Sequence, residues 1–380
     1  MPSLRVHHHL TSIAAEQWDA LRTNDYPFLS YAFLNALEQT QCVGDPQGWH
    51  PLHLTLEDDQ GELMAAMPMY LKSHSWGEYV FDGAWQEAWE RAGFHYFPKL
   101  VTSIPFTPAS GERFLFNADV LSFEQALEYF VTAVRQLCHE QQFSGWHGLF
   151  IKSEQLEAFK QQSLIPRMDC QYHWYNRGYQ NFDDFLATFT SRKRKNLRKE
   201  RARIQAQEIE LKVLEGAQIR AEQLDAFFEF YQLTYLKHGM QSYLNKAFFQ
   251  QLLKTMPDQI LLVMAYHQGR AVAGAWSFKD RHNLYGRYWG CDEEFDSLHF
   301  ETCYYQGIDY CIAHGLSHFD PGAQGEHKIQ RGFEPIPTWS VHWIDDPQFR
   351  AAVAEFTQSE QTWVEQQMQE LASHLPFHQS

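Results

Sequence analysis

The chain has 380 residues, which is long for one compact core; at roughly 100 to 200 residues per domain it predicts two domains. Apolar residues make up 44% and aromatic residues 16% of the chain, which excludes a largely disordered protein. The net charge of -16 excludes broad coating by nucleic acid, so any polyanionic ligand needs a local basic patch.

The first half predicts a hairpin followed by a strand, a helix and a strand. Apolar runs at 52–57 and 62–72 flank a polar turn that ends in Gly61, and another strand is predicted at 99–104. A helical pattern at 123–142 and a strand at 147–151 follow.

A long helix is predicted between the halves, at 182–207. Asn181 is a suitable N-cap, and Asp183 and Asp184 follow in the first turn. The later part is basic, since residues 192–203 hold eight of the chain's 31 lysines and arginines. We place the domain boundary just before this helix, which gives domains at 1–178 and 179–380.

The second half predicts two helices, at 221–237 and 245–254, and then a three-stranded meander. The meander strands are expected at 260–266, 271–278 and 283–290, followed by an amphipathic helix at 299–314 that ends at Gly315. A strand at 316–320, a glycine-containing loop and a last strand at 338–344 complete the order. The first half has a similar order, with Gly61 corresponding to Gly269, so the halves are expected to be a diverged tandem repeat.

This order is similar to the GNAT acyltransferase fold, and specific strings resemble the FemAB-like family, often labelled peptidoglycan-biosynthesis related. The strings are 191–200 (SRKRKNLRKE), 286–291 (GRYWGC) and 322–333 (GAQGEHKIQRGF), with 27–31 (PFLSY) and 77–82 (GEYVFD) in the first half. The expected fold class is α/β, with α+β mixed sheets, in a tandem GNAT-like acyltransferase fold with two lobes.

The resemblance implies a bacterial acyltransferase in which an amine attacks the acyl donor directly, without a covalent enzyme intermediate. Fem-type relatives move amino acids from aminoacyl-tRNA onto a cell-wall precursor. The expected acceptor is therefore an amine of a small molecule, an amino acid or a precursor peptide.

Direct transfer needs the acyl carbonyl at a break between central strands, where main-chain N–H groups can stabilise the oxyanion. The end of the third meander strand suits this role, because Gly290 allows a bulge or a close ligand approach there. An ordinary strand-end glycine is the alternative. The predicted donor-binding residues are Arg287, Tyr288, Trp289, Gly290, Gly322, Gly325 and Arg331.

The donor is left open between an acyl-CoA and an aminoacyl-tRNA. The strand is not followed by the glycine-containing motif that cradles pyrophosphate in acetyl-CoA enzymes of this superfamily, and the segment 291–298 holds four carboxylates instead. Phosphates of CoA, a nucleotide-linked precursor or tRNA are expected on one face of the basic helix. That face contains Arg194, Lys195, Arg198 and Arg201; a solvated helix balanced by carboxylates is the alternative.

The catalytic residues are expected in the loop at 322–333, where Glu326, His327 and Lys328 stand beside glycines. Glu326 or His327 is the candidate general base. The resemblance implies that a basic residue before the pair 332–333, here Lys328 or Arg331, acts on the donor. The predicted acceptor-binding residues are Lys72, His74, Glu78 and Tyr305, with structural roles as the alternative.

Other classes are disfavoured. No apolar run approaches the ~20 residues of a membrane span and the N-terminus lacks a secretory signal, so a cytoplasmic protein is expected. The six cysteines form no C-x-x-C pair, which predicts no metal site, and hydrolase, NTPase, dehydrogenase and zincin motifs are absent. The predicted function is a GNAT-fold N-acyltransferase, and the alternative is a non-catalytic ligand-binding module that retains the fold.

Overall fold

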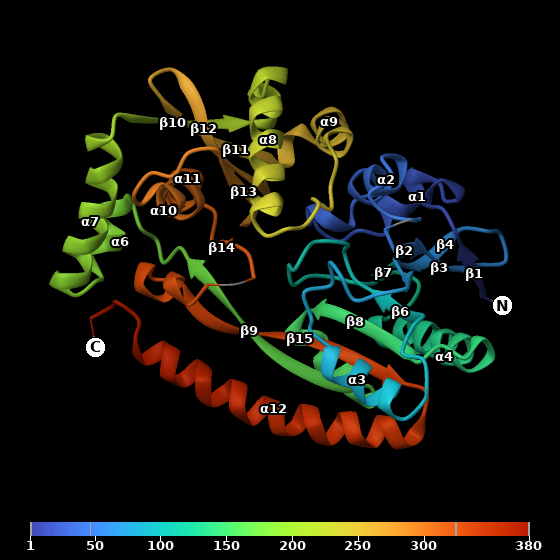
Figure 1. The fold of residues 1–380 in the computed structure, drawn as a ribbon. Helices are drawn as coiled ribbons and strands as arrows, with labels where there is room; N and C mark the ends of the chain where they lie inside the picture. Colours follow the sequence, from blue (N-terminus) through green and yellow to red (C-terminus); the bar gives the residue numbers. More distant parts are fainter. Residues whose placement is uncertain (1, 46, 324, 379–380) are drawn as a thin grey trace. The chain divides into compact units, whose positions relative to one another are not determined.

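The computed structural model describes residues 2–45, 47–323 and 325–378 (Figure 1). Its contacts divide the chain into two compact units. Unit 1 comprises Met1–Cys170 and Pro337–Gln366, and unit 2 comprises Gln171–Ile336 and Gln367–Ser380. The domain boundary predicted between residues 178 and 179 stays a prediction.

Unit 1 contains a four-stranded antiparallel sheet in the order β1-β3-β4-β7. Its strands are β1 (Ser3–His7), β3 (His53–Glu57), β4 (Leu63–Met67) and β7 (Leu115–Phe116). The predicted hairpin is present as β3 and β4. The second predicted strand, 62–72, is divided, because Pro68 follows β4 and the chain then enters another sheet as β5.

The second set of strands in unit 1 runs in the order β2-β5-β6-β8-β15. These strands are β2 (Trp49–Pro51), β5 (Tyr70–Lys72), β6 (Lys99–Thr102), β8 (Gly145–Ile151) and β15 (Glu334–Ile344). The β6–β8 pair is parallel, whereas β15 is antiparallel to β8. The last strand of the second half therefore completes a sheet built by the first half, and residues 337–366 group with unit 1.

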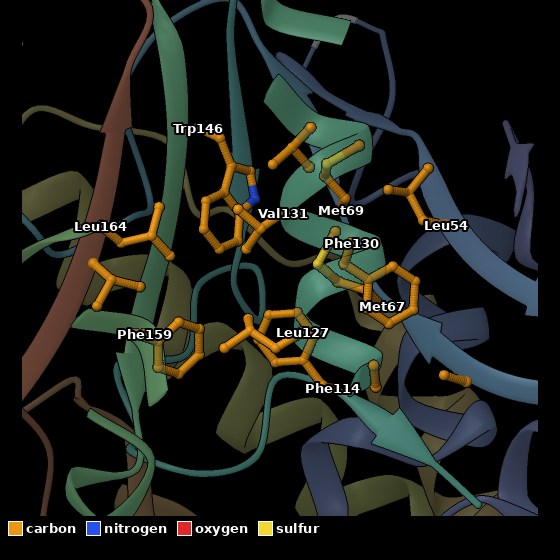
Figure 2. Packing of buried hydrophobic residues seen from close by; sticks show 14 of the residues in the cluster. Leu54, Met67, Met69, Phe114, Leu127, Phe130, Val131, Trp146, Phe159 and Leu164 are labelled. Atoms are coloured by element: carbon orange, nitrogen blue, oxygen red, sulfur yellow. The ribbon is translucent and has the colours of Figure 1, made fainter. Parts of the chain in front are cut away.

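Helix α4 (Phe123–Gln141) covers one face of this sheet and builds the main core of unit 1. A capping box between Ser122 and Gln125 begins the helix. Figure 2 shows Val131 of α4 beside Trp146 of β8, and both are fully or almost fully buried. The other helices of unit 1 are α1 (Ala15–Ala20), α2 (Tyr31–Gln39), α3 (Gly83–Arg91), α5 (Leu156–Gln161) and the first part of α12 (Pro347–Ser373).

Unit 2 contains the predicted meander as β11 (Ile260–His267), β12 (Arg270–Lys279) and β13 (Asn283–Cys291). The two-residue turn between β11 and β12 has Gln268 at φ 51° and Gly269 at φ 78°, the left-handed pair that suits a twisted hairpin. β10 (Ile209–Glu215) extends one edge. β14 (His318–Asp320) pairs with β13 in parallel and with the end of β9 (Ile165–Tyr175) antiparallel.

The helices of unit 2 agree with the predicted order. They are α6 (Phe182–Ala187), α7 (Ser191–Ala206), α8 (Ala221–Lys237), α9 (Lys246–Thr255), α10 (Leu298–Phe300), a π-helical turn (Glu301–Tyr305) and α11 (Gln306–His314). Gly315 ends α11 in the left-handed conformation, as predicted, and Asn181 caps α6 by accepting from the main-chain N–H of Asp184. In Figure 1, α8 lies along the meander, which it packs against.

The predicted single helix at 182–207 is wrong, because the chain breaks it into α6 and α7 at residues 188–190. Buried Phe189 forms an isolated β-bridge with Phe377. The Thr190 N–H donates to the Pro376 carbonyl, and the His378 N–H donates to the Thr188 carbonyl. These bonds replace the helical ladder over one turn.

Several 3-10 turns connect the elements, at Leu10–Ser12, Pro27–Leu29, Ser153–Gln155, Gly216–Gln218, Pro257–Gln259 and Glu326–Arg331. No helix within the described ranges is long and apolar enough to cross a membrane.

Candidate active site

In unit 2, β14 ends soon after it meets β13. Their parallel pairing covers Asn283–Tyr285 opposite His318–Asp320, while β13 itself continues to Cys291. The ladder therefore ends after three residue pairs. Beyond Tyr285, β13 therefore continues without a β14 ladder beside it, and direct acyl transfer requires a gap of this kind next to a central strand.

A bulge in β13 lies beside this gap. Trp276 of β12 pairs with Tyr288 and Ser277 pairs with Gly286, so Arg287 is the additional residue. The Arg287 side chain, which is only 1% exposed, donates to both carboxylate oxygens of Asp320, with an Nη1–Oδ1 distance of 3.2 Å. The bulge thus directs a buried guanidinium at the end of β14.

Gly290 and its neighbours have packing roles. A Cβ atom on Gly290 would lie 2.0 Å from the carbonyl oxygen of Phe230, so the glycine allows β13 to approach the backbone of α8. The bulge expected at Gly290 lies at Arg287 instead. Tyr288 packs among the core rings of Tyr231 and Phe249, and Trp289 contacts His299.

Asp320 is the centre of a buried polar cluster that the sequence interpretation missed. Its Oδ1 lies 3.6 Å from Nε2 of His173 and accepts from the Gly322 N–H at 2.9 Å. His173 Nδ1 in turn lies 2.7 Å from Nε2 of His318. Asp320 ended a predicted strand, but His173 comes from the first half of the chain, so only the topology brings them together.

The charges in this cluster follow from burial and neighbours. Burial raises the pKa of Asp320, but the nearby Arg287 and His173 lower it. Hydrogen bonds from Arg287 and from the Gly322 N–H lower it further. Together these effects outweigh burial and hold the pKa of Asp320 well below its usual range. Burial lowers the pKa of His173 to about 3, so this ring is neutral at pH 7.

Lys328 lies next to this cluster in the predicted catalytic loop. The side chain is buried, and Nζ donates to the carbonyl oxygen of Gly322 at 2.6 Å. Burial lowers its pKa to about 8; Asp320 opposes this shift and Arg287 adds to it. Gly322 and Gly325, at φ 100° and 115°, adopt a backbone conformation that favours glycine. Gln324 of the same loop lies outside the described residues.

The two candidate bases differ in their surroundings, although both are exposed. Glu326 faces solvent, whereas Nε2 of His327 lies 2.9 Å from the Tyr304 hydroxyl and the ring packs on Phe300. Desolvation, with repulsion from the nearby cations of Arg331 and Lys328, lowers the pKa of His327. A neutral imidazole at pH 7 can accept a proton.

Arg331 and Tyr305 meet at Glu200 of α7. The Arg331 guanidinium carbon lies 3.3 Å from the ring centroid of Phe300, and Nη2 donates to Glu200 at 2.9 Å. The Tyr305 hydroxyl donates to the other oxygen of Glu200. These contacts tie the loop to α7 and to the π-helical turn.

The four predicted phosphate-binding residues of α7 fall into two groups. Arg201 donates to Glu301 and Asp309 at 2.9 and 2.6 Å, and Arg198 pairs with Asp183 at 2.7 Å. These two are balanced by carboxylates. Within the described ranges, the side chains of Arg194 and Lys195 have no ion pair.

The acidic segment 291–298 is compensated as well. Arg270 pairs with Asp292 and Glu293, Lys237 with Glu294 and Arg203 with Asp296. The segment is therefore not the uncompensated negative patch that its sequence suggests, and its acidity alone does not argue against a pyrophosphate.

Three of the predicted acceptor residues lie in unit 1, and two of them share a buried cluster around Lys99. Lys99 Nζ contacts Glu78 at 2.8 Å and also Asp82, and Nζ of Lys72 lies 3.7 Å above the Trp49 ring. Burial lowers the pKa of Lys72 to about 7, against the opposing charge of Glu78. Lys99 was missed, although a lysine that opens a predicted buried strand needs charged partners.

The other two acceptor candidates lie outside this cluster. His74 accepts from the Trp76 N–H at 3.2 Å on a loop of unit 1, while Tyr305 belongs to unit 2. No group of three or more potential metal ligands gathers in the described part of the chain.

Comparisons with known proteins place the fold. A family model for FemAB-like proteins, described as peptidoglycan biosynthesis/recognition, matches residues 9–379. A search of curated proteins found no match. Among solved structures, the C-terminal domain of a putative lysylphosphatidylglycerol synthetase from Agrobacterium fabrum is 11% identical, with 91% of this chain and 95% of that chain covered and a TM-score of 0.53.

Two further structures have the same architecture. FemX is 12% identical over 91% of this chain and 99% of its own, with a TM-score of 0.52. L-PGS from Bacillus licheniformis is 11% identical, with 85% of this chain and 95% of that chain covered and a TM-score of 0.50. The predicted tandem GNAT-like α/β fold is confirmed. The family supports an acyl- or aminoacyltransferase, and the match over nearly the whole length shows that the chain belongs to the FemAB-like family.

Proposed function

We propose that this protein is an N-acyltransferase that moves an acyl or aminoacyl group from acyl-CoA or aminoacyl-tRNA to an amine. One observation supports this most directly: the β13–β14 ladder ends after three residue pairs, and the buried amine of Lys328 donates to Gly322, just beyond the end of β14. The family to which the chain belongs supports the same chemistry.

Lys328 is the group that stabilises negative charge on the acyl oxygen. The Arg287 guanidinium is engaged by Asp320, whereas the Lys328 ammonium has three N–H donors and gives one to Gly322. With a pKa of about 8 it is largely charged at pH 7. A cation held in a buried site acts more strongly on a developing oxyanion than it would in water.

His327 is the general base, and Tyr304 passes the proton to it. As the amine nitrogen bonds to the acyl carbon, the Tyr304 hydroxyl takes the amine's proton and releases its own to His327 Nε2, 2.9 Å away. The bond from the acyl carbon to the donor's sulfur or oxygen then breaks. The leaving group regains the proton along the same path.

The acceptor in this proposal is a small amine, an amino acid or a cell-wall-precursor peptide. Tyr305 remains its proposed contact in unit 2, while Lys72, His74 and Glu78 of unit 1 remain predictions from the sequence. Arg194 and Lys195 remain the proposed contacts of donor phosphates.

A melting-temperature screen against CoA, acetyl-CoA, longer acyl-CoAs and charged tRNA tests the donor, because a ligand that binds the folded state raises the melting temperature. A shift with CoA compounds that is lost in Lys328→Met indicates CoA-dependent transfer and excludes tRNA. A shift with charged tRNA alone favours Fem-type transfer. Binding without any transfer product, detected by mass spectrometry, identifies the non-catalytic module instead.

Once a donor is known, His327→Gln and Tyr304→Phe test the base. We expect both to lower kcat by roughly 100-fold to 10,000-fold while donor binding is retained. His314→Gln is the control, because this histidine stacks on Tyr310 at the far end of the same helical segment. Unchanged turnover in both variants would exclude the relay.

A further inference from the structure

Unit 1 contains a pocket that the proposed reaction does not use. Segments of β9, β15 and α12 line it, together with Phe81, and all of its lining residues belong to unit 1. Its volume is about 230 Å³. Sites for drug-sized ligands occupy roughly 300–1,000 Å³, so this pocket suits a smaller molecule.

One wall of the pocket is built by a strained residue. In the β8–β15 ladder, Trp339 pairs with Ile151 and Val341 with Gly148, so Leu149 and Phe150 together face Ser340. Phe150 has φ 56°, a left-handed conformation that bulky side chains rarely adopt, and its side chain is buried in the wall. Strain of this kind persists where the surroundings hold it, and it gathers at ligand sites.

The pocket's charged groups leave a net negative charge. Arg167 donates to both carboxylate oxygens of Glu360, at 2.7 and 2.8 Å. Its other terminal nitrogen, Nη1, donates a hydrogen bond to the Phe81 carbonyl at 2.8 Å. This pair is neutral, and each of the three guanidinium nitrogens donates one hydrogen bond to the protein. Asp169, which is exposed and accepts from the Cys170 N–H at 2.7 Å, supplies a carboxylate with no ion pair of its own among the described residues.

Ser340 adds a hydrogen-bond acceptor to the pocket. Its Oγ lies 2.9 Å from His342 Nε2, and the two Nδ1 atoms of His342 and His147 lie 2.6 Å apart. Burial lowers the pKa of both histidines, that of His147 to about 3, so a single hydrogen lies between the two rings. When this hydrogen is on Nδ1 of His342, Nε2 of His342 accepts a hydrogen bond from the Ser340 hydroxyl. The lone pairs of the Ser340 oxygen can then accept a hydrogen bond from a ligand.

Exposed aromatic rings complete the lining. Trp363 is 60% exposed and Phe81 69% exposed, which is unusual for such large apolar side chains. Their faces attract cations. We propose that this pocket binds a small primary ammonium compound with an apolar body, whose N–H groups donate to Asp169 and Ser340. The proposal concerns binding only and holds whichever reaction unit 2 performs.

Isothermal titration calorimetry on the full chain, with three probes of similar shape, tests the ligand's charge. We expect phenethylammonium to bind at least tenfold more tightly than neutral phenethyl alcohol or anionic phenylacetate. Asp169→Asn should weaken ammonium binding about tenfold, while Asp119→Asn, an exposed control in unit 1, should leave it unchanged. No binding of phenethylammonium, or equal binding of all three probes, would overturn the proposal.

Variants of the walls test the position of the ligand. Trp363→Ala and Ser340→Ala should each weaken phenethylammonium binding severalfold, and Trp76→Ala should not, since Trp76 is 71% exposed in the same unit but does not line the pocket. Melting temperatures of all variants show whether each one folds. Equal losses in Trp363→Ala and Trp76→Ala would place the ligand elsewhere and contradict the proposal.

Discussion

At the scale of single residues, three buried lysines differ in pKa because different groups surround them. Burial alone lowers a lysine's pKa, as it does for Lys72 and Lys328. For Lys99, the carboxylates of Glu78 and Asp82 outweigh burial and raise the pKa. Lys99 is therefore a fixed structural charge, whereas Lys328 can change its protonation near neutral pH and suits a site of chemistry.

The neutral buried histidines predict how stability changes with pH. His147 and His173 have a pKa of about 3 in the folded chain and about 6.5 when unfolded, so the unfolded state binds more protons between these values. Stability should therefore fall as the pH drops below about 6.5, by roughly 1 kcal/mol per pH unit for each histidine. Urea denaturation at pH 7, 6, 5 and 4 measures this slope.

Variants separate these histidines from the other acid-sensitive groups. His173→Gln should flatten the slope, while His139→Gln, whose side chain is 85% exposed, should not. Asp320 affects stability in a more acidic pH range, because its pKa is lowered in the folded chain. Its contribution to the free energy of unfolding is fully present above its unfolded pKa of about 3.9 and is lost as the pH falls below that value. An unchanged slope in His173→Gln above pH 4 would contradict a neutral buried ring.

At the scale of elements, local patterns predicted well where local forces decide. The meander, α8 and the end of α11 at Gly315 follow from apolar periodicity and from turn and cap residues. The break between α6 and α7 was not predictable, because its cause is the bridge to Phe377 at the other end of the chain. The completion of the unit 1 sheet by β15 is likewise a long-range pairing that leaves no local pattern.

The same distinction applies to the candidate site. Arg287, Gly322 and Lys328 were predicted from motifs, and the structure brings them together around Asp320. His173 was missed, since nothing near it in sequence shows that β9 will pair with β14.

Gly290 offers a test of how closely β13 and α8 must pack. Gly290→Ala places a Cβ atom 2.0 Å from the Phe230 carbonyl, and the strand or the helix must then move. We expect a loss of about 1–3 kcal/mol in the free energy of unfolding, measured by urea denaturation. Gly83→Ala at the start of α3, with no atom within 4 Å, should be neutral or stabilising by up to about 1 kcal/mol. Equal stability of the two variants would show that this contact is not tight.

At the scale of the whole molecule, an acidic protein concentrates positive charge on one helix. The chain carries a net charge of -16, and most acidic segments near α7 already have basic partners. Arg198 and Arg201 are used in this way, which leaves Arg194 and Lys195 as the two of the four predicted phosphate contacts that have no carboxylate partner in the described residues. A donor with many phosphates would be drawn to that end of the helix.

The double variant Arg194→Gln/Lys195→Gln should therefore weaken the binding of charged tRNA roughly tenfold at 0.1 M salt. It should also lower the magnitude of the slope of log K against log salt concentration by about 1.4 to 1.8, because two phosphate contacts are lost. Filter binding at several salt concentrations measures both quantities. Lys212→Gln/Lys254→Gln removes the same charge from exposed positions elsewhere in unit 2 and should change neither. Equal losses of tRNA affinity in both double variants would mean that the overall charge, and not this end of α7, governs the interaction. Unaltered tRNA binding in Arg194→Gln/Lys195→Gln would remove these two residues from the donor site.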